Sequence, residues 1–215
     1  MHPKVLVDAC AELVRLVLTF EHPADAVVAR YFRGYRALGP RERATLSDTV
    51  YTVLRKKLLF EQLARSGQGP RERRLAILGF AGPRDFVKAA LSEQEKAWLD
   101  GCDAVRAEDL LAPHRHNLPE WLVAPLKSQL GEAGFWALAD SLAQPAPLDL
   151  RVNALKEKRE QVQKELAQAA IKTEATPYSP WGLRVAGKPA LARLDAFARG
   201  AIEVQDEGSQ LLALL

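Results

Sequence analysis

The fold is decided by the stretch QPAPLDLRVNAL at residues 144–155, where the spacing of the apolar residues changes. Its two prolines are separated by one residue and cannot lie inside a helix, because proline lacks the backbone N–H and disfavours helical conformation in the residue before it. Directly after them, Leu148, Leu150 and Val152 alternate with polar residues, as in a half-buried strand. We therefore predict a domain boundary here, between a helical part and a part that contains strands.

Upstream of the boundary, apolar residues recur every three or four positions and glycine or proline marks the breaks, which predicts a mainly helical domain. The longest predicted helix runs from Pro40 to about Arg65, and Ser92 with Glu95 forms a capping box that starts another. On the first helix, the residues expected to face inward are Val5, Leu6, Leu13, Leu16 and Val17. The predicted helices cover residues 4–19, 40–65, 72–80, 83–90, 119–130 and 132–143, with one more after Pro23 and one from Ser92 to before Gly101; residues 102–117 are predicted to be a loop with one helical turn.

Downstream of the boundary, short strand-like segments alternate with helical ones, which predicts a small sheet backed by helices. The predicted helix at residues 157–169 is expected to bury Leu155, Val162, Leu166 and Ala169 on one face. The last predicted helix, residues 207–215, ends in a leucine-rich run that has no partner in the sequence, so we expect a boundary imposed on a longer protein. The other predicted elements are strands at 148–153, 173–175, 182–186 and 201–205 and a short helix near 189–196.

The composition is that of a globular protein, because 48% of the 215 residues are hydrophobic and 27% are charged. The two cysteines, Cys10 and Cys102, are far apart and have no metal-ligand or redox spacing, which favours a reducing compartment and two inert thiols. No targeting signal or membrane-spanning stretch is recognisable, and we expect the protein to be cytoplasmic.

Three motifs occur in a fixed order in the second half of the chain: LDLRVNAL at 148–155, PYSPWGL at 177–183 and IEVQDEGSQLLALL at 202–215. Together with the helix start LPEWL at 118–122, they resemble the segment that precedes the cofactor-binding domain in the RsmB/Sun family of bacterial ribosomal RNA (cytosine-5) methyltransferases. The resemblance extends over about residues 117–215 and is much weaker over residues 1–112.

The resemblance implies a domain order for the whole protein. Residues 1–112 would form a helical domain similar to the antitermination factor NusB, residues 113–145 connecting helices, and residues 146–215 an RRM-like α/β domain. A Rossmann-like domain that binds S-adenosylmethionine would follow, with its glycine-rich loop and two catalytic cysteines downstream of Leu215. Cys10 and Cys102 do not match those cysteines, because the family's cysteines follow Pro and Thr whereas these follow Ala9 and Gly101.

This chain alone is therefore expected to bind no cofactor and to be inactive, since methylation of the cytosine ring needs a thiolate nucleophile and a methyl donor. The expected partners are small-subunit ribosomal RNA and the protein's own catalytic domain, with no membrane.

The basic residues are concentrated at the front of the chain, where residues 1–75 carry 14 basic and 8 acidic side chains. A helical basic set there is predicted to contact a phosphate backbone, although an ordinary solvated surface explains the same pattern. Its members are Arg30, Arg33, Arg36, Arg41, Arg43, Arg55, Lys56 and Lys57.

In the α/β part, Arg151 and Asn153 lie on one face of the first predicted strand, with Lys156 just beyond, so they are candidates to contact an RNA backbone or base edge. The alternative is that Arg151 pairs with Asp149 or Glu157 and that Asn153 caps the following helix.

Tyr178 and Trp181 are candidates to stack on unpaired bases, or they pin the turn onto the sheet. Asp206 is a helix cap or a residue packed near the cofactor pocket. His114 and His116 are too sparse for a metal site, and a loop contact, with RNA as a candidate partner, is the better interpretation.

Two other classes of function stay open. A non-catalytic RNA-binding or antitermination-type module would act through RNA and protein partners. A purely structural interaction domain would use the acidic middle region, residues 76–145, as a protein-docking surface and would bind RNA weakly at every salt concentration.

Overall fold

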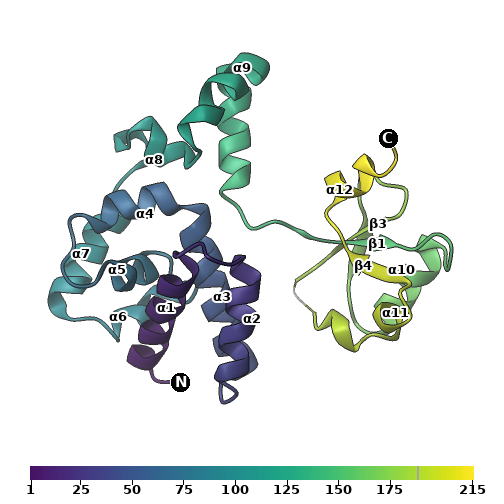
Figure 1. Cartoon of the computed structure of the whole chain (residues 1–215), viewed down its shortest axis with the longest axis horizontal. Helices are drawn as coiled ribbons and strands as arrows, with labels where there is room; N and C mark the ends of the chain where they lie inside the picture. The colour runs from purple at the N-terminus through teal and green to yellow at the C-terminus, as the bar shows by residue number, and fades with distance from the viewer. Residues whose placement is uncertain (188) are drawn as a thin grey trace. The chain divides into compact units, whose positions relative to one another are not determined.

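The computed structural model, which describes residues 1–187 and 189–215, divides into a helical unit, Met1–Pro145, and an α/β unit, Ala146–Leu215 (Figure 1). A helical part followed by a small α/β part is the fold class that the sequence predicts. Each unit has its own cluster of buried apolar side chains and is described by itself. Among the described residues, no helix is both long and apolar enough to cross a membrane.

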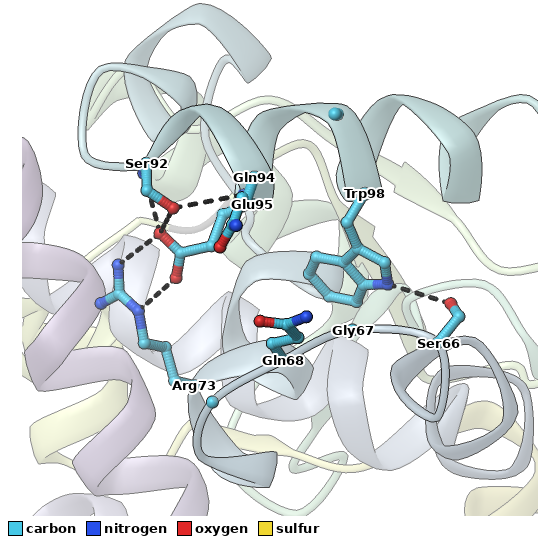
Figure 2. Close-up of a pocket in the computed structure, with 10 residues that line it drawn as sticks. Ser66, Gly67, Gln68, Arg73, Ser92, Gln94, Glu95 and Trp98 are labelled. Atoms are coloured by element: carbon cyan, nitrogen blue, oxygen red, sulfur yellow. Dashed lines mark hydrogen bonds and ion pairs between the residues drawn. The ribbon is translucent and has the colours of Figure 1, made fainter.

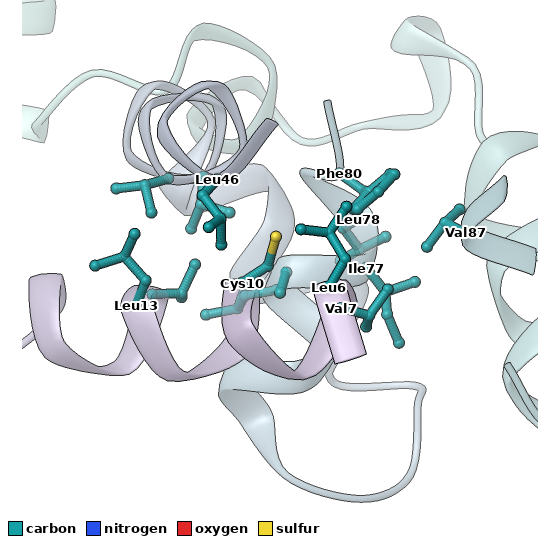
Figure 3. Close-up of a cluster of buried hydrophobic side chains, with 14 of the residues drawn as sticks. Leu6, Val7, Cys10, Leu13, Leu46, Ile77, Leu78, Phe80 and Val87 are labelled. Atoms are coloured by element: carbon teal, nitrogen blue, oxygen red, sulfur yellow. The ribbon is translucent and has the colours of Figure 1, made fainter. Parts of the chain in front are cut away.

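The core of the helical unit is built around α1, Pro3–Val17, which packs against α3, Pro40–Arg55, and α5, Arg71–Leu78. Figure 3 shows side chains of α1, among them Leu6, Cys10 and Leu13, facing Leu46 of α3 and Ile77 of α5. The prediction for Val5 is wrong, because its side chain is 53% exposed. The unit contains α2 (Ala24–Gly34), α3 (Pro40–Arg55), α4 (Lys57–Ala64), α5 (Arg71–Leu78), α6 (Arg84–Lys88), α7 (Glu93–Asp103), η1 (Ala107–Asp109), α8 (Ala112–His116) and α9 (Glu120–Leu142).

The single helix predicted for residues 40–65 is wrong, because the chain breaks at Lys56, whose φ of −111° and ψ of 30° are not helical. The new helix, α4, packs on α5 and α8. Its first turn receives an acceptor from far along the chain, since Asn117 Oδ1 accepts the N–H of Leu59 at 3.0 Å. Apolar spacing continues across the break, so the periodicity alone gives no sign of it.

The capping box that begins α7 is confirmed: Ser92 Oγ accepts the N–H of Glu95 at 3.3 Å, and the Glu95 carboxylate accepts the N–H of Ser92 at 2.9 Å. The predicted end before Gly101 is wrong, because α7 continues to Asp103 and buries Cys102. The predicted loop at 102–117 accordingly holds the end of α7, η1 and α8.

The last helical element, α9, is two helices joined at Gly131, which has a φ of 68° and a ψ of 175°. A positive φ of this kind suits glycine, which has no Cβ to clash with its own backbone. The sequence predicts these two helices on either side of the same residue. Only Phe135 and Ala139 of α9 are buried.

The α/β unit has the order β1 (Leu148–Val152), α10 (Arg159–Gln168), β2 (Thr173–Ala175), β3 (Gly182–Val185), η2 (Leu191–Arg193), α11 (Asp195–Ala198), β4 (Ile202–Val204) and α12 (Glu207–Leu212). The sheet is antiparallel with strand order β2-β3-β1-β4. Its core joins Leu150, Leu183 and Ile202 of the strands to Val162 and Leu166 of α10.

Two of the residues predicted to be buried with α10 are exposed. Leu155 is 98% exposed because it lies in a turn, and the helix begins only at Arg159. Ala169 follows the end of the helix and is also exposed. Leu212, Leu214 and Leu215 at the end of the chain are exposed, as the sequence predicts.

Candidate nucleic-acid interface

The polar face of the sheet carries charged residues in matching register. Glu174 lies beside Arg184, Arg184 beside Asp149, and Arg151 beside Glu203. Because successive strand residues point to opposite faces, these side chains lie on the face away from Leu150, Val152 and Leu183. The strands bring opposite charges together on this face.

Asp149 is the buried anchor of that face, with a side chain only 1% exposed. Its two carboxylate oxygens accept hydrogen bonds from Nε and Nη2 of Arg184 at 2.8 and 2.9 Å, a bidentate geometry. The hydrogen bonds that Arg184 donates to Asp149 raise the pKa of Arg184. Strand alternation places Asp149 on the polar face, and the paired arginine allows it to be buried there.

Arg151 therefore does not pair with Asp149, nor with Glu157, which instead pairs with Arg199. Its Nη1 donates to Gln205 Oε1 at 3.3 Å and lies 3.8 Å from a carboxylate oxygen of Glu203. The guanidinium carbon also lies 5.6 Å from the centre of the Trp181 ring, a cation–π distance. These contacts orient Arg151 and leave its side chain about one third exposed.

Both polar atoms of the Asn153 side-chain amide make hydrogen bonds within the α/β unit. Its Nδ2 donates to the carbonyl of Gly200 at 3.3 Å, and its Oδ1 accepts the N–H of Leu155 at 3.2 Å. Because α10 begins only at Arg159, Asn153 caps the turn before the helix and not the helix itself. The same amide joins the end of β1 to Gly200, two residues before β4 begins.

Arg151, Asn153 and Trp181 line one cavity of about 280 Å³, together with Leu155 and Glu203. Lys156 does not line this cavity. Its ammonium instead donates to the carbonyl of Arg199 at 2.5 Å. The structure thus brings together three of the predicted residues and gives the fourth a different contact.

The two aromatic residues of the turn between β2 and β3 differ. Trp181 is half-buried and packs against the core, as expected of an aromatic that pins the turn. Tyr178 is 75% exposed, so the pinning interpretation is wrong for it. Its ring is therefore available for contact.

The turn is held by α12, through residues that the sequence reasoning missed. Glu207 Oε1 accepts the backbone N–H groups of Tyr178 and Ser179 at 2.7 and 2.8 Å, and Ser179 Oγ donates to Gln210 Oε1 at 2.7 Å. Burial by itself raises the pKa of Glu207, but the hydrogen bonds from Ser179 and Tyr178 outweigh it and hold the pKa below its usual range. In the sequence, only the motif at 202–215 draws attention to Glu207, and this motif does not show that Tyr178 and Ser179 are its hydrogen-bond partners.

Asp206 is the N-cap of α12, because its Oδ1 accepts the N–H groups of Gly208 and Ser209 at 2.8 and 3.3 Å. This agrees with the capping interpretation of that residue.

The basic set in the helical unit separates into two groups. Arg43 Nε donates to the carbonyl of Leu38 at 2.9 Å, Arg55 donates to Thr52 Oγ1 at 3.3 Å, and Lys57 pairs with Glu61 at 3.0 Å. Lys56 is half-buried at the break between α3 and α4. Arg30, Arg33, Arg36 and Arg41 are exposed, and their side chains make no hydrogen bond or ion pair with the residues that the structure describes.

The expected loop contact by His116 is wrong, because this residue is only 3% exposed and packs against Phe135. Its Nδ1 accepts the N–H of Leu118 at 3.0 Å. Burial lowers the pKa of His116, which favours the neutral imidazole. Within residues 1–187 and 189–215, no three His, Cys, Asp or Glu side chains are grouped to hold a metal ion.

Neither cysteine offers an accessible thiolate. Cys10 is fully buried, and burial raises its pKa to about 12. Cys102 is also buried, and burial likewise raises its pKa. These thiols do not fit the nucleophile that cytosine methylation needs, so no step of such chemistry is assigned to them.

The order of the elements and of the strands in the α/β unit identifies its class of fold. The βαββαβ order and the strand order are those of a ferredoxin-like domain, and residues 118–192 match the family model of the ferredoxin-like domain of RsmF/B-like methyltransferases. This match confirms the resemblance to the RsmB/Sun family. The matched range includes α9 of the helical unit as well as most of the α/β unit.

Two similar proteins are named as ribosomal RNA small subunit methyltransferases. The chain is 29% identical to the probable ribosomal RNA small subunit methyltransferase B of Synechocystis sp. over 206 residues, which cover 95% of this chain and 46% of the relative. It is 35% identical to ribosomal RNA small subunit methyltransferase B of Pasteurella multocida over 103 residues, which cover 47% of this chain and 22% of the relative. The chain thus spans less than half the length of these relatives.

A solved structure shares the fold. The crystal structure of PH0851 covers 100% of this chain with a TM-score of 0.66 and 18% sequence identity, and 55% of that structure is matched. At this identity the likeness concerns the fold alone.

Proposed function

We propose that this chain is the RNA-recognition portion of an S-adenosylmethionine-dependent ribosomal RNA (cytosine-5) methyltransferase, and that the chemistry is carried by residues outside it. The observation that carries the proposal is the match of residues 118–192 to the ferredoxin-like domain of RsmF/B-like methyltransferases. The small-subunit ribosomal RNA named for the relatives is the proposed substrate, and the cytoplasm the proposed location.

The α/β unit is proposed to act as an RRM-like surface. RRM sheets stack bases on aromatic residues of their strands. Here the polar face has Arg151, Gly182 and Arg184 on β1 and β3, so stacking would rely on Tyr178 and Trp181 at the turn. Arg151 is held beside Trp181 and remains partly exposed, which suits a contact with a phosphate or a base edge.

The helical unit is proposed to be NusB-like over residues 1–112, with residues 113–145 connecting it to the RRM-like domain at 146–215. Its share of RNA binding is assigned to Arg30, Arg33, Arg36 and Arg41, which are exposed. Arg43, Arg55 and Lys57 make contacts within the unit and are proposed to support it instead.

Binding by the α/β unit is tested with Arg151→Ala in the full 215-residue chain, using fluorescence anisotropy with a labelled small-subunit ribosomal RNA fragment. Loss of the contacts of one arginine is expected to weaken binding by roughly 5- to 100-fold. Arg193→Ala is the matched control, because Arg193 is exposed and its side chain makes no hydrogen bond or ion pair with the described residues. Equal affinity of the two variants would contradict the assignment of Arg151.

The activity is tested with the protein extended through its natural open reading frame, by transfer of labelled methyl groups from S-adenosylmethionine to unmodified small-subunit ribosomal RNA. The 215-residue chain is the parallel control. Transfer by the long form alone is expected. A long form that binds RNA without transferring methyl groups would favour the alternative, a non-catalytic antitermination-type module.

A further inference from the structure

A second cavity, of about 550 Å³, lies in the helical unit, between the loop that follows α4 and the first turns of α7. Figure 2 shows the indole of Trp98 reaching into this space from α7 and the amide of Gln68 reaching into it from the loop. Gln94, one turn before Trp98, lines the same cavity. None of these residues belongs to the basic set or to the sheet face described above.

Trp98 is held in one orientation. Its indole Nε1 donates to Ser66 Oγ at 3.2 Å, so the polar atom of the ring is already satisfied. The loop backbone runs against the same ring, because a Cβ added at Gly67 would lie 2.7 Å from Trp98 Cε2. The remaining surface of the indole is a fixed apolar wall of the cavity, which suits a flat partner.

The charged residues of the cavity neutralise each other. Arg73 Nε donates to Glu95 Oε1 at 2.7 Å, and Arg73 Nη1 donates to Asp8 at 2.7 Å. Glu95 also accepts from Ser92 in the capping box. A ligand with a large net charge therefore finds no unpaired counter-charge among the lining residues.

Two amides remain without a partner. Gln68 and Gln94 are exposed, and their side chains make no hydrogen bond with any residue that the structure describes. Each amide offers one acceptor oxygen and two donor hydrogens. A glutamine amide can pair with the adjacent donor and acceptor of adenine, and an aromatic wall can stack on the face of the base.

We propose that this cavity binds one unpaired adenine, stacked on Trp98 and hydrogen-bonded by Gln68 or Gln94. That the adenine belongs to RNA rests on the proposed function. The site would add base recognition to a helical unit whose exposed arginines are proposed to contact phosphates, since phosphate contacts carry no direct sequence information.

The first test compares two short RNA oligonucleotides, one with a single central adenine and one with an abasic residue at that position, by fluorescence anisotropy. The full chain is expected to bind the adenine form roughly ten-fold more tightly, the contribution of one base stacked on an aromatic ring. Trp98→Leu is expected to remove this difference and to leave binding of the abasic form unchanged. Gln94→Ala should reduce the difference. Because Gln94 is exposed, this variant is expected to fold, and it tests the site even if Trp98→Leu does not fold.

The matched controls are Trp121→Leu and Gln129→Ala, because both residues are exposed on α9, outside the cavity. They are expected to keep the full difference between the two oligonucleotides. Equal binding of both oligonucleotides by the unmodified chain would overturn the adenine site while leaving RNA recognition standing.

A titration with adenosine separates the two proposals if the chain binds neither oligonucleotide. In a chain labelled with ¹⁵N-tryptophan, adenosine is expected to shift the indole N–H signal of Trp98 and not that of Trp121. That shift without RNA binding would support the cavity and count against the RNA-recognition function. No shift at Trp98 would overturn the adenine site.

Discussion

At the scale of single residues, Gly182 shows how close contact fixes a residue type. It begins β3 beside Thr176, and a Cβ at this position would lie 1.9 Å from Thr176 Oγ1 and 3.0 Å from its Cβ. Since Thr176 is itself buried, it has little room to move. The motif PYSPWGL contains this glycine, but the sequence cannot name the residue that it contacts.

Replacement of Gly182 with alanine is expected to destabilise the α/β unit by roughly 1–3 kcal/mol, the usual cost of forcing extra volume into a packed site. Urea unfolding followed by circular dichroism measures the change. Gly101→Ala is the control with the opposite expectation, because Gly101 lies inside α7 with no atom within 4 Å of an added Cβ. That variant should gain up to about 1 kcal/mol, and a Gly182→Ala protein of unchanged stability would show that the contact is absent.

His116 gives a prediction about pH. Burial lowers its pKa, helped by Lys127 and His114 and opposed by Glu120, so the folded state favours the neutral ring. The contribution of neutral His116 to the free energy of unfolding is therefore fully present above the unfolded-state pKa of about 6.5. It is lost as the pH falls through the lower pKa of the folded state. Protonation of Nδ1 would also remove the acceptor for the N–H of Leu118.

We expect the melting temperature of the helical unit to fall as the pH is lowered below about 6.5, and His116→Asn, which keeps an acceptor without a titrating ring, to show a smaller fall. His22→Gln is the control, since His22 is exposed. Equal pH dependence of the unmodified chain and the His116→Asn variant, measured by differential scanning calorimetry, would rule out His116 as the source.

At the scale of elements, sequence periodicity predicts most helices and strands. It does not predict which distant residues form hydrogen bonds with them. The segment 40–65 keeps helical spacing across Lys56, and the break is stabilised by Asn117, which lies 58 residues beyond Leu59. The burial of Asp149 has the same cause, because its partner Arg184 lies on another strand. Local patterns cannot report such contacts, because the partners are distant in sequence.

Asn117 can be tested because it has two separable roles. Its backbone φ is 53°, and its side chain caps the first turn of α4. Asn117→Gly should lose the cap and the hydrogen bond from Nδ2 to the carbonyl of His114 but keep the backbone conformation, with the cap costing about 0.5–2 kcal/mol. Asn117→Ala should lose the cap and also pay for the left-handed backbone, roughly 1 kcal/mol more.

The comparison of these two variants by chemical denaturation is its own control. If both are as stable as the unmodified chain, α4 does not depend on Asn117. If both lose the same amount, the positive φ adds no cost.

At the scale of the whole molecule, the sequence predicts a helical part followed by an α/β part because the hydrophobic period changes at residues 144–155. The candidate site is predicted less completely. Arg151, Asn153 and Trp181 do line one cavity, although the Asn153 amide also makes internal hydrogen bonds. Lys156 makes a different contact, and Glu207 was not predicted. Residue type and strand alternation identify candidates, but only the packed structure shows which side chains remain free.

The same distinction between free and engaged residues predicts how RNA binding responds to salt. Arg30, Arg33, Arg36 and Arg41 are exposed, whereas Arg43, Arg55 and Lys57 are engaged within the helical unit. For single-stranded RNA, each phosphate contact contributes about 0.7 to the slope of log K against log salt. Replacement of the four free arginines with glutamine should therefore reduce the slope by up to about 3 and lower the affinity most at low salt.

A control with Arg65→Gln and Arg193→Gln, two exposed arginines outside the set, should lose little of the slope. If the fourfold variant and the control have the same slope in anisotropy titrations over a range of salt concentrations, phosphate contacts by this set are excluded; if the unmodified chain binds weakly with no salt dependence, a protein-docking role for the acidic region 76–145 becomes the better account.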